Sequence, residues 1–176
     1  METILRERKD GLLILRLNRP EKYNSFNREM ALSLQQALAD ASTNNEIRCV
    51  MIIGMGKAFS AGQDLGEVTG SNPMPFSKIL KEHYNPIITH IRNLNKPVVA
   101  AINGVAAGAG ANIALCCDVV IASEHASFIQ AFSKIGLVPD SGGTYFLPRL
   151  IGFQKASALA MTGDKITSKE AKQLGL

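Results

Sequence analysis

The order of apolar and polar positions along the 176 residues predicts strands that alternate with helices. Residues 12–17 (LLILRL) form a short β-like run, which we expect to pair with residues 3–8. Residues 49–53 (CVMII), 97–102 (PVVAAI) and 118–122 (DVVIA) are almost continuously apolar. Such runs are typical of strands that are buried on both faces of a sheet.

Between the strands, apolar residues return with helical spacing. Residues 28–41 carry one apolar stripe, and Asn27 is a suitable N-cap before them. The stripe consists of Met30, Leu34, Ala37, Leu38 and Ala41. Residues 77–94 predict another helix, which Pro86 kinks or splits because proline lacks an N–H. This alternation predicts an α/β fold with right-handed crossovers and one domain over residues 1–176.

Composition and charge narrow the class of protein. Apolar residues make up 46% of the chain and charged residues 19%, which is ordinary for a globular protein. The net charge is 19 − 15 = +4, but the basic residues are scattered, so we expect no dedicated nucleic-acid arm. The charged N-terminus (METILRERKDG) lacks the apolar segment of a signal peptide, and no apolar stretch is long enough to span a bilayer.

Cysteines and histidines indicate neither a disulfide framework nor a metal site. Cys49, Cys116 and Cys117 are odd in number and two are adjacent, which favours a reducing compartment. His83 and His90 lie seven residues apart without a neighbouring cluster of Cys or carboxylates, so we predict no metal site. We therefore expect a cytoplasmic protein without a membrane partner.

Two segments rich in small residues follow predicted strands, at 58–65 (AFSAGQDL) and 103–112 (NGVAAGAGAN). The second passes into a helix through residues with almost no side chain, which leaves backbone N–H groups at the helix start unpaired. Together with the helix dipole, such donors suit an anion or a developing oxyanion. Close packing of the helix on the sheet needs the same small residues, so residue types alone leave both interpretations open.

A dinucleotide-binding fingerprint is the rival interpretation of the second segment, and we reject it. Gly108 and Gly110 supply the first two glycines, but Ile113 occupies the third position. The nearest acidic residue, Asp118, follows too soon to bind a ribose.

A third segment, residues 136–144 (GLVPDSGGT), contains an aspartate just before a predicted helix. Asp140 or Ser141 could cap that helix. The pattern alone favours capping over catalysis.

These segments together resemble the enoyl-CoA hydratase/isomerase, or crotonase, family. The resemblance is carried, in matching order and spacing, by AFSAGQDL at 58–65, KPVVAAINGVAAGAGANIALCCDVVIAS at 96–123, GLVPDSGGTYFLPRLIG at 136–152 and MTGDKITSKEAKQLGL at 161–176. It implies a spiral of repeated ββα units, an acyl-CoA substrate whose coenzyme A is not a separate cofactor, and a homotrimer or dimer of trimers. Family chains continue into helices that close the site, so we expect this chain to lack its C-terminal helical segment.

The resemblance also assigns the reaction site. It implies an oxyanion hole made by the N–H groups of Gln63 and Ala109. The two glutamates of the family's hydratases fall on Asn112 and Phe132, and neither is a carboxylate. Hydration needs a base and an acid, so a standard hydratase mechanism is not expected. Asp140 occupies the position of a carboxylate that some isomerases use, and burial near Phe132 would raise its basicity.

Contacts with coenzyme A are implied for backbone atoms around 61–65 and for the loop near Lys22 and Asn24. Lys22 and Lys57 could meet phosphates or be exposed surface. The predicted substrate-binding residues are Lys22, Asn24, Ala61, Gly62, Asp64, Leu65, Gly108, Asn112 and Phe132. The pocket wall is expected to include the 66–85 region, where Gly70-Ser71-Asn72-Pro73 suggests a flexible loop.

The subgroup that isomerises ring-1,2-epoxyphenylacetyl-CoA in phenylacetate degradation resembles the chain in NGVAAGAGA, in AFSKIGLVPDSGGT and in the lone aspartate. We therefore expect an isomerase of that substrate or of Δ3 enoyl-CoA. One alternative is a hydratase that works without the two glutamates. Another is a non-catalytic CoA- or RNA-binding member of the family, although no specific nucleic-acid partner is expected.

Overall fold

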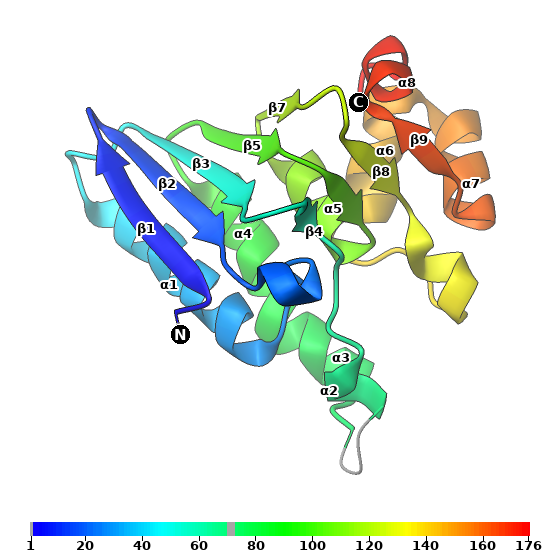
Figure 1. Ribbon diagram of the computed structural model, residues 1–176, viewed down its shortest axis with the longest axis horizontal. Helices are drawn as coiled ribbons and strands as arrows, with labels where there is room; N and C mark the ends of the chain where they lie inside the picture. The colour runs from blue at the N-terminus through cyan, green and yellow to red at the C-terminus, as the bar shows by residue number, and fades with distance from the viewer. Residues whose placement is uncertain (1, 70–72) are drawn as a thin grey trace.

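The computed structural model describes residues 2–69 and 73–176, and it contains two sheets flanked by helices (Figure 1). One sheet has the order β1-β2-β3-β5-β7 and the other the order β4-β6-β8-β9. The strands are β1 Ile4–Lys9, β2 Leu12–Leu17, β3 Cys49–Gly54, β4 Ala58–Ser60, β5 Val98–Ile102, β6 Val105–Ala107, β7 Val119–Ala122, β8 Ser127–Ile129 and β9 Lys165–Thr167. Strands β1 and β2 pair with each other, as predicted, and form an antiparallel hairpin in which Ile4 is opposite Leu17.

The strands are used in consecutive pairs. The first member of each pair (β3, β5, β7) joins the larger sheet, and the second (β4, β6, β8) joins the smaller one. Within each sheet these strands are parallel, so a helical segment must return the chain between pairs. This arrangement confirms the α/β class and the repeated ββα units.

The helices begin and end close to the predicted positions. The α-helices are α1 Arg28–Thr43, α2 Gly66–Thr69, α3 Phe76–Ile79, α4 Asn85–Asn93, α5 Ala109–Cys116, α6 Gly143–Ile151, α7 Phe153–Thr162 and α8 Ser168–Leu174. The side chain of Asn27 accepts a hydrogen bond from the N–H of Met30, which confirms the predicted N-cap. Short 3₁₀ helices cover Pro20–Lys22 and Ala131–Ile135.

Pro86 divides the helix predicted over residues 77–94. A π turn, Leu80–Tyr84, lies between α3 and α4, and the N–H of Asn85 donates to the carbonyl of Leu80. Pro86 has no N–H to donate to the preceding turn, and its ring crowds the carbonyl groups of that turn. The turn before it is therefore wound as a π turn instead of an α turn. Residues 70–72, which belong to the predicted flexible loop, lie outside the described residues.

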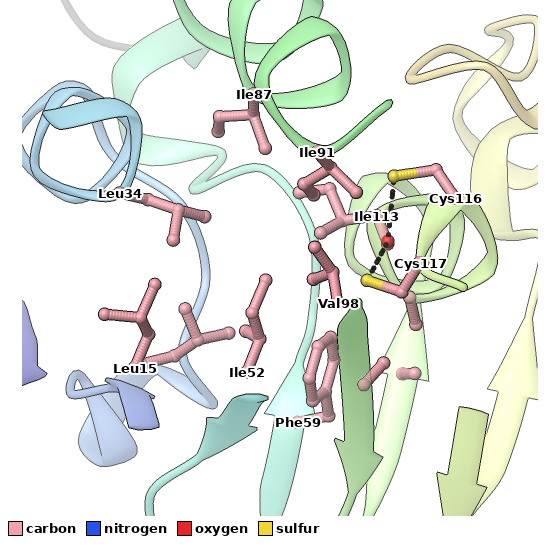
Figure 2. Packing of buried hydrophobic residues seen from close by; sticks show 14 of the residues in the cluster. Leu15, Leu34, Ile52, Phe59, Ile87, Ile91, Val98, Ile113, Cys116 and Cys117 are labelled. Atoms are coloured by element: carbon pink, nitrogen blue, oxygen red, sulfur yellow. Dashed lines mark hydrogen bonds between the residues drawn. The ribbon is translucent and has the colours of Figure 1, made fainter. Parts of the chain in front are cut away.

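The main core lies between the larger sheet and the helices α1, α4 and α5. Figure 2 shows its centre, which includes Leu15, Leu34, Ile52, Phe59, Ile87, Ile91, Val98 and Ile113. Each fully buried Leu or Ile side chain contributes roughly 1.5–3 kcal/mol. The thiols of Cys116 and Cys117 both donate to the carbonyl of Ile113 in this region. Helix α5 contacts strands of both sheets, so it is anchored where the sheets meet.

The prediction of three strands buried on both faces is only partly right. Strands β3 and β5 alternate fully buried with partly buried positions. Strand β7 lies at the edge of the sheet, with Val119 48% and Ile121 59% exposed. An apolar run records which residues prefer burial, but the neighbours that cover a strand are decided by the fold.

In the described part of the chain, no helix combines the length and apolar character needed to cross a membrane.

Candidate active site

A pocket of about 200 Å³ opens between the end of β4, the start of α5 and the segment that contains α3 and the π turn. Its lining is mostly apolar and has a few polar groups, which is typical of a small-molecule site. The apolar side chains are Leu65, Phe76, Ile79, Phe132, Ile135 and Leu137. The other lining residues are Ala61, Gln63, Tyr84, Gly108, Ala109, Ala131, Lys134 and Asp140.

Two glycine turns lie close together beside the pocket. Gly62 has φ +87° and Gly108 has φ +52°, which is the region that favours glycine. A Cβ added to Gly62 would lie 2.9 Å from the Ala107 carbonyl oxygen and 3.2 Å from the Ala109 nitrogen. Only glycine therefore leaves room at the Ala109 N–H.

Each turn presents one free donor. Phe26 donates to the carbonyl of Gly62 and accepts from the N–H of Asp64, so the N–H of Gln63 is directed away from Phe26. Ala109 is the first residue of α5 and its N–H has no acceptor within the helix. Among the described residues, neither N–H donates to another protein group. Gln63 and Ala109 both line the pocket, and two free N–H groups in one pocket can hold an oxyanion.

Asp140 is the carboxylate that lines this pocket, within the residues that the structure describes. Burial raises the pKa of its carboxyl to about 6, although a hydrogen bond of 2.8 Å from the Ser141 hydroxyl acts in the opposite direction. A carboxylate with this pKa can remove a proton near neutral pH and return it. The N-terminus of α6 has no capping hydrogen bond from any side chain that the structure describes. The geometry therefore supports a catalytic role for Asp140 better than a helix-capping role.

Asn112 was expected to contact substrate, but its side chain is fully buried and does not line the pocket. Its amide nitrogen donates to the backbone carbonyl of Asp140 at 2.9 Å, and its amide oxygen accepts from Gln130 at 2.8 Å. Both ends are thus used inside the protein. Phe132, the other position assigned to a hydratase glutamate, does line the pocket as an apolar side chain.

Asn24 is likewise not a pocket residue. Its side chain is fully buried, donates to the carbonyls of Met55 and Ala58, and accepts from the N–H of Arg19. These bonds tie the loop before α1 to the end of β3 and the start of β4, so the side chain is used inside the protein. The contact of this loop with coenzyme A stays a prediction.

The charged residues predicted near coenzyme A lie beside the pocket. Asp64 forms an ion pair with Arg19 at 2.8 Å and accepts from the N–H of Gly66, so its carboxylate is already occupied. Lys22 and Lys57 are exposed and do not line the pocket. Of the predicted backbone contacts, Ala61, Leu65 and Gly108 do line it.

Sequence reasoning missed Tyr84. Its ring is 1% exposed, and its hydroxyl donates to the side-chain oxygen of Gln63 at 2.8 Å. The side-chain nitrogen of Gln63 in turn donates to Glu67 at 3.0 Å. Burial and the nearby Asp140 raise the pKa of Tyr84, so it remains a donor at neutral pH. A tyrosine in an otherwise apolar helical stripe, two residues before Pro86, was the available signal.

Across the described residues, no group of three or more His, Cys, Asp or Glu side chains is arranged to hold a metal ion.

Comparison with known proteins adds to this geometry. The family model described as enoyl-CoA hydratase/isomerase matches residues 7–176. The 1,2-epoxyphenylacetyl-CoA isomerase of Escherichia coli is 44% identical over 179 residues, with 100% of this chain and 68% of that protein covered. A protein of Rhodobacter capsulatus named probable enoyl-CoA hydratase is 44% identical over 174 residues, with 99% and 66% covered.

Solved structures of enoyl-CoA hydratases have the same fold as this chain. A crystal structure of an enoyl-CoA hydratase from Bacillus anthracis has a TM-score of 0.90 at 35% identity and covers 98% of this chain and 67% of that one. One from Mycobacterium avium subsp. paratuberculosis has a TM-score of 0.90 at 34% identity, with 99% and 66% covered. The chain thus spans about two thirds of the length of the relatives that it matches.

Proposed function

Because this chain belongs to the enoyl-CoA hydratase/isomerase family, we propose that it isomerises the acyl group of a coenzyme A thioester through an enolate. The observation that carries the proposal is the pairing of Asp140 with two free N–H groups across an apolar pocket. Such a site can move one proton and stabilise the resulting negative charge without a second acid.

In the proposed reaction, the thioester oxygen accepts hydrogen bonds from Gln63 and Ala109. The Asp140 carboxylate removes a proton from C2 of a Δ3 enoyl-CoA, and the electrons move onto the thioester oxygen. The same carboxyl group returns the proton at C4, which leaves a Δ2 double bond and a regenerated carboxylate. Losing one oxyanion donor typically costs ~10²–10³-fold in rate. A pKa near 6 suits Asp140 for both transfers.

The acyl group is proposed to lie among Phe76, Ile79, Phe132 and Leu137, a lining that suits an aryl or alkyl chain. The similarity to 1,2-epoxyphenylacetyl-CoA isomerase makes ring-1,2-epoxyphenylacetyl-CoA the ring substrate to test first. Hydration is the alternative, since another relative at the same identity is named a probable hydratase. Water addition would need a second acid or base, and the positions for it hold Asn112 and Phe132.

The test compares the parent chain with Asp140→Asn on two substrates, 3-hexenoyl-CoA for isomerisation and crotonyl-CoA for hydration. We expect the parent to form the conjugated 2-enoyl thioester and Asp140→Asn to lose at least ~10²-fold in kcat with little change in KM. Asp164→Asn, which alters an exposed aspartate away from this pocket, is the matched control. Near-normal isomerisation by Asp140→Asn, or faster hydration than isomerisation by the parent, would contradict the proposal.

We propose that backbone atoms around 61–65 and the exposed Lys22 contact coenzyme A, and that the protein assembles as a homotrimer or dimer of trimers. The free cysteines Cys49, Cys116 and Cys117 support a reducing compartment such as the cytoplasm. A non-catalytic RNA-binding role would instead give nucleic-acid affinity that falls steeply with salt.

A further inference from the structure

Helix α5 begins at the oxyanion hole and, one turn later, holds the loop of the proposed base. Ala109 is its first residue, and Asn112 follows three positions on, which places the two on neighbouring positions of one side of the helix. The amide nitrogen of Asn112 donates to the backbone carbonyl of Asp140 at 2.9 Å. One rigid element therefore contacts both halves of the site.

The orientation of the Asn112 amide is defined by its surroundings. Gln130, which follows β8 and is 5% exposed, donates to the amide oxygen at 2.8 Å. The oxygen of Asn112 must then face Gln130 and its nitrogen must face Asp140, because an amide donates only through nitrogen. Buried bonds of this kind are costly to leave unmade.

Gly143 completes the contact. Its N–H donates to the same Asp140 carbonyl at 2.8 Å, and a Cβ at Gly143 would lie 2.2 Å from the Asn112 amide nitrogen. The φ of Gly143 is not positive, so the missing side chain makes room for the amide rather than permitting an unusual backbone conformation. By contrast, the loop before Asp140 is open, with Val138 81% exposed.

We propose that Asn112 is a positioning residue that fixes the Asp140 carboxylate relative to the N–H of Ala109, acting through the Asp140 backbone carbonyl. The inference rests on the proposed function of Asp140 and goes beyond it. A position at which the family's hydratases carry a reacting glutamate serves here to hold a different carboxylate in place. The base and the oxyanion donor are then kept at one separation by a single helix, which is what proton removal at C2 and proton return at C4 by one carboxyl group require.

Two variants disturb the contact in different ways. Asn112→Ala removes the amide donor. Gly143→Ala keeps the Asn112 side chain, but the added methyl group pushes its amide away from the Asp140 carbonyl. If one variant fails to fold, the other still tests the idea. Both should lower kcat for 3-hexenoyl-CoA by ~10- to 10²-fold and leave KM within about twofold, since a misplaced base slows chemistry more than binding.

A second measurement does not depend on activity. The Asp140 carboxyl is titrated by ¹³C NMR in the unliganded protein, where burial sets its pKa to about 6. A loosened loop admits water to the carboxyl, so in Asn112→Ala and Gly143→Ala its midpoint should fall toward 3.8. Tyr84 and Lys134 are the other titratable side chains that line the pocket, and their resonances are separate from those of a carboxyl.

A double mutant separates positioning from general damage. In the Asp140→Asn background, adding Asn112→Ala should cause no further loss of kcat, because there is no base left to misplace. Leu38→Ala, which opens a cavity in the buried face of α1, is the control for lost stability and should leave the Asp140 midpoint unchanged.

Wild-type kcat and an unchanged midpoint in both variants would overturn the inference, as would a further loss of kcat when Asn112→Ala is added to Asp140→Asn. Failure of the proposed function is distinguishable, because then the parent itself would not isomerise 3-hexenoyl-CoA, while the NMR titration would still report whether Asn112 holds the Asp140 loop.

Discussion

Replacing Asp140 with Asn is expected to stabilise the folded protein at neutral pH while it removes activity. Asp140 lies in an apolar pocket, and burial raises the pKa of its carboxyl from 3.8 to about 6. Keeping it ionised at pH 7 therefore costs free energy that a neutral amide avoids. The Ser141 hydroxyl, which donates to one carboxyl oxygen, can donate to the amide oxygen of Asn as well.

The magnitude follows from the shift in pKa. A rise from 3.8 to about 6 is about two units, which corresponds to about 3 kcal/mol at 1.36 kcal/mol per unit. Because the Asp140 side chain is partly exposed, solvent screens part of this energy. We therefore expect Asp140→Asn to raise the free energy of unfolding by about 2–3 kcal/mol at neutral pH. Between these pH values the folded state binds more protons than the unfolded state, so the parent loses stability as pH rises through about 6. Asp140→Asn lacks this loss.

The assay is urea denaturation of the parent and Asp140→Asn at several values from about pH 4 to about pH 8. The difference between the two free energies of unfolding cancels the other titrating groups, including His83, whose pKa is lowered by burial. This difference should grow by about 2–3 kcal/mol in favour of the variant across the range. Asp164→Asn, an exposed site, should show no such growth. A difference independent of pH would refute the assignment of a buried, ionisable Asp140.

Three other changes are informative. Gly62→Ala should reduce kcat at least ~10²-fold in the isomerase assay, because its methyl group would occupy space at the N–H of Ala109 and its φ is +87°. Asn27→Ala should lower the free energy of unfolding by about 1 kcal/mol in urea, as expected for a lost N-cap, and an unchanged midpoint would contradict the cap. Tyr84→Phe should lower the free energy of unfolding by about 1–3 kcal/mol in the same assay, because the side-chain oxygen of Gln63 loses its donor. An unchanged free energy of unfolding would contradict this and would show that water replaces the hydroxyl.

Local rules predicted the strands of the larger sheet and most of the helices, but not the short strands β4, β6, β8 and β9 of the smaller sheet. The helix after Asn27, the hairpin of β1 and β2, and the split at Pro86 each follow from residues within one or two turns of one another. The glycine turns at Gly62 and Gly108 could be identified in the same way, since small residues between a strand and a helix leave N–H groups uncovered.

Local rules failed where the answer depends on which distant residues meet. The apolar run 118–122 is as hydrophobic as a central strand, yet Ile121 is 59% exposed because its strand lies at the sheet edge. Asn24 and Asn112 are polar residues near predicted site motifs, and both prove to be buried connectors. Nothing within a few residues of either one indicates the carbonyl that it binds.

The sequence by itself determined the family, because the family's motifs depend on residue identity and short spacings. The predictions of ββα units, of Gln63 and Ala109 as oxyanion donors and of Asp140 as base all came from the resemblance to that family. Only the tertiary structure decided what that aspartate can do. Its raised pKa comes from the apolar pocket around it, and its backbone carbonyl accepts a hydrogen bond from Asn112, which lies 28 residues earlier in the chain. Burial and long-range hydrogen bonds arise from chain segments brought together by folding, so no local pattern records them.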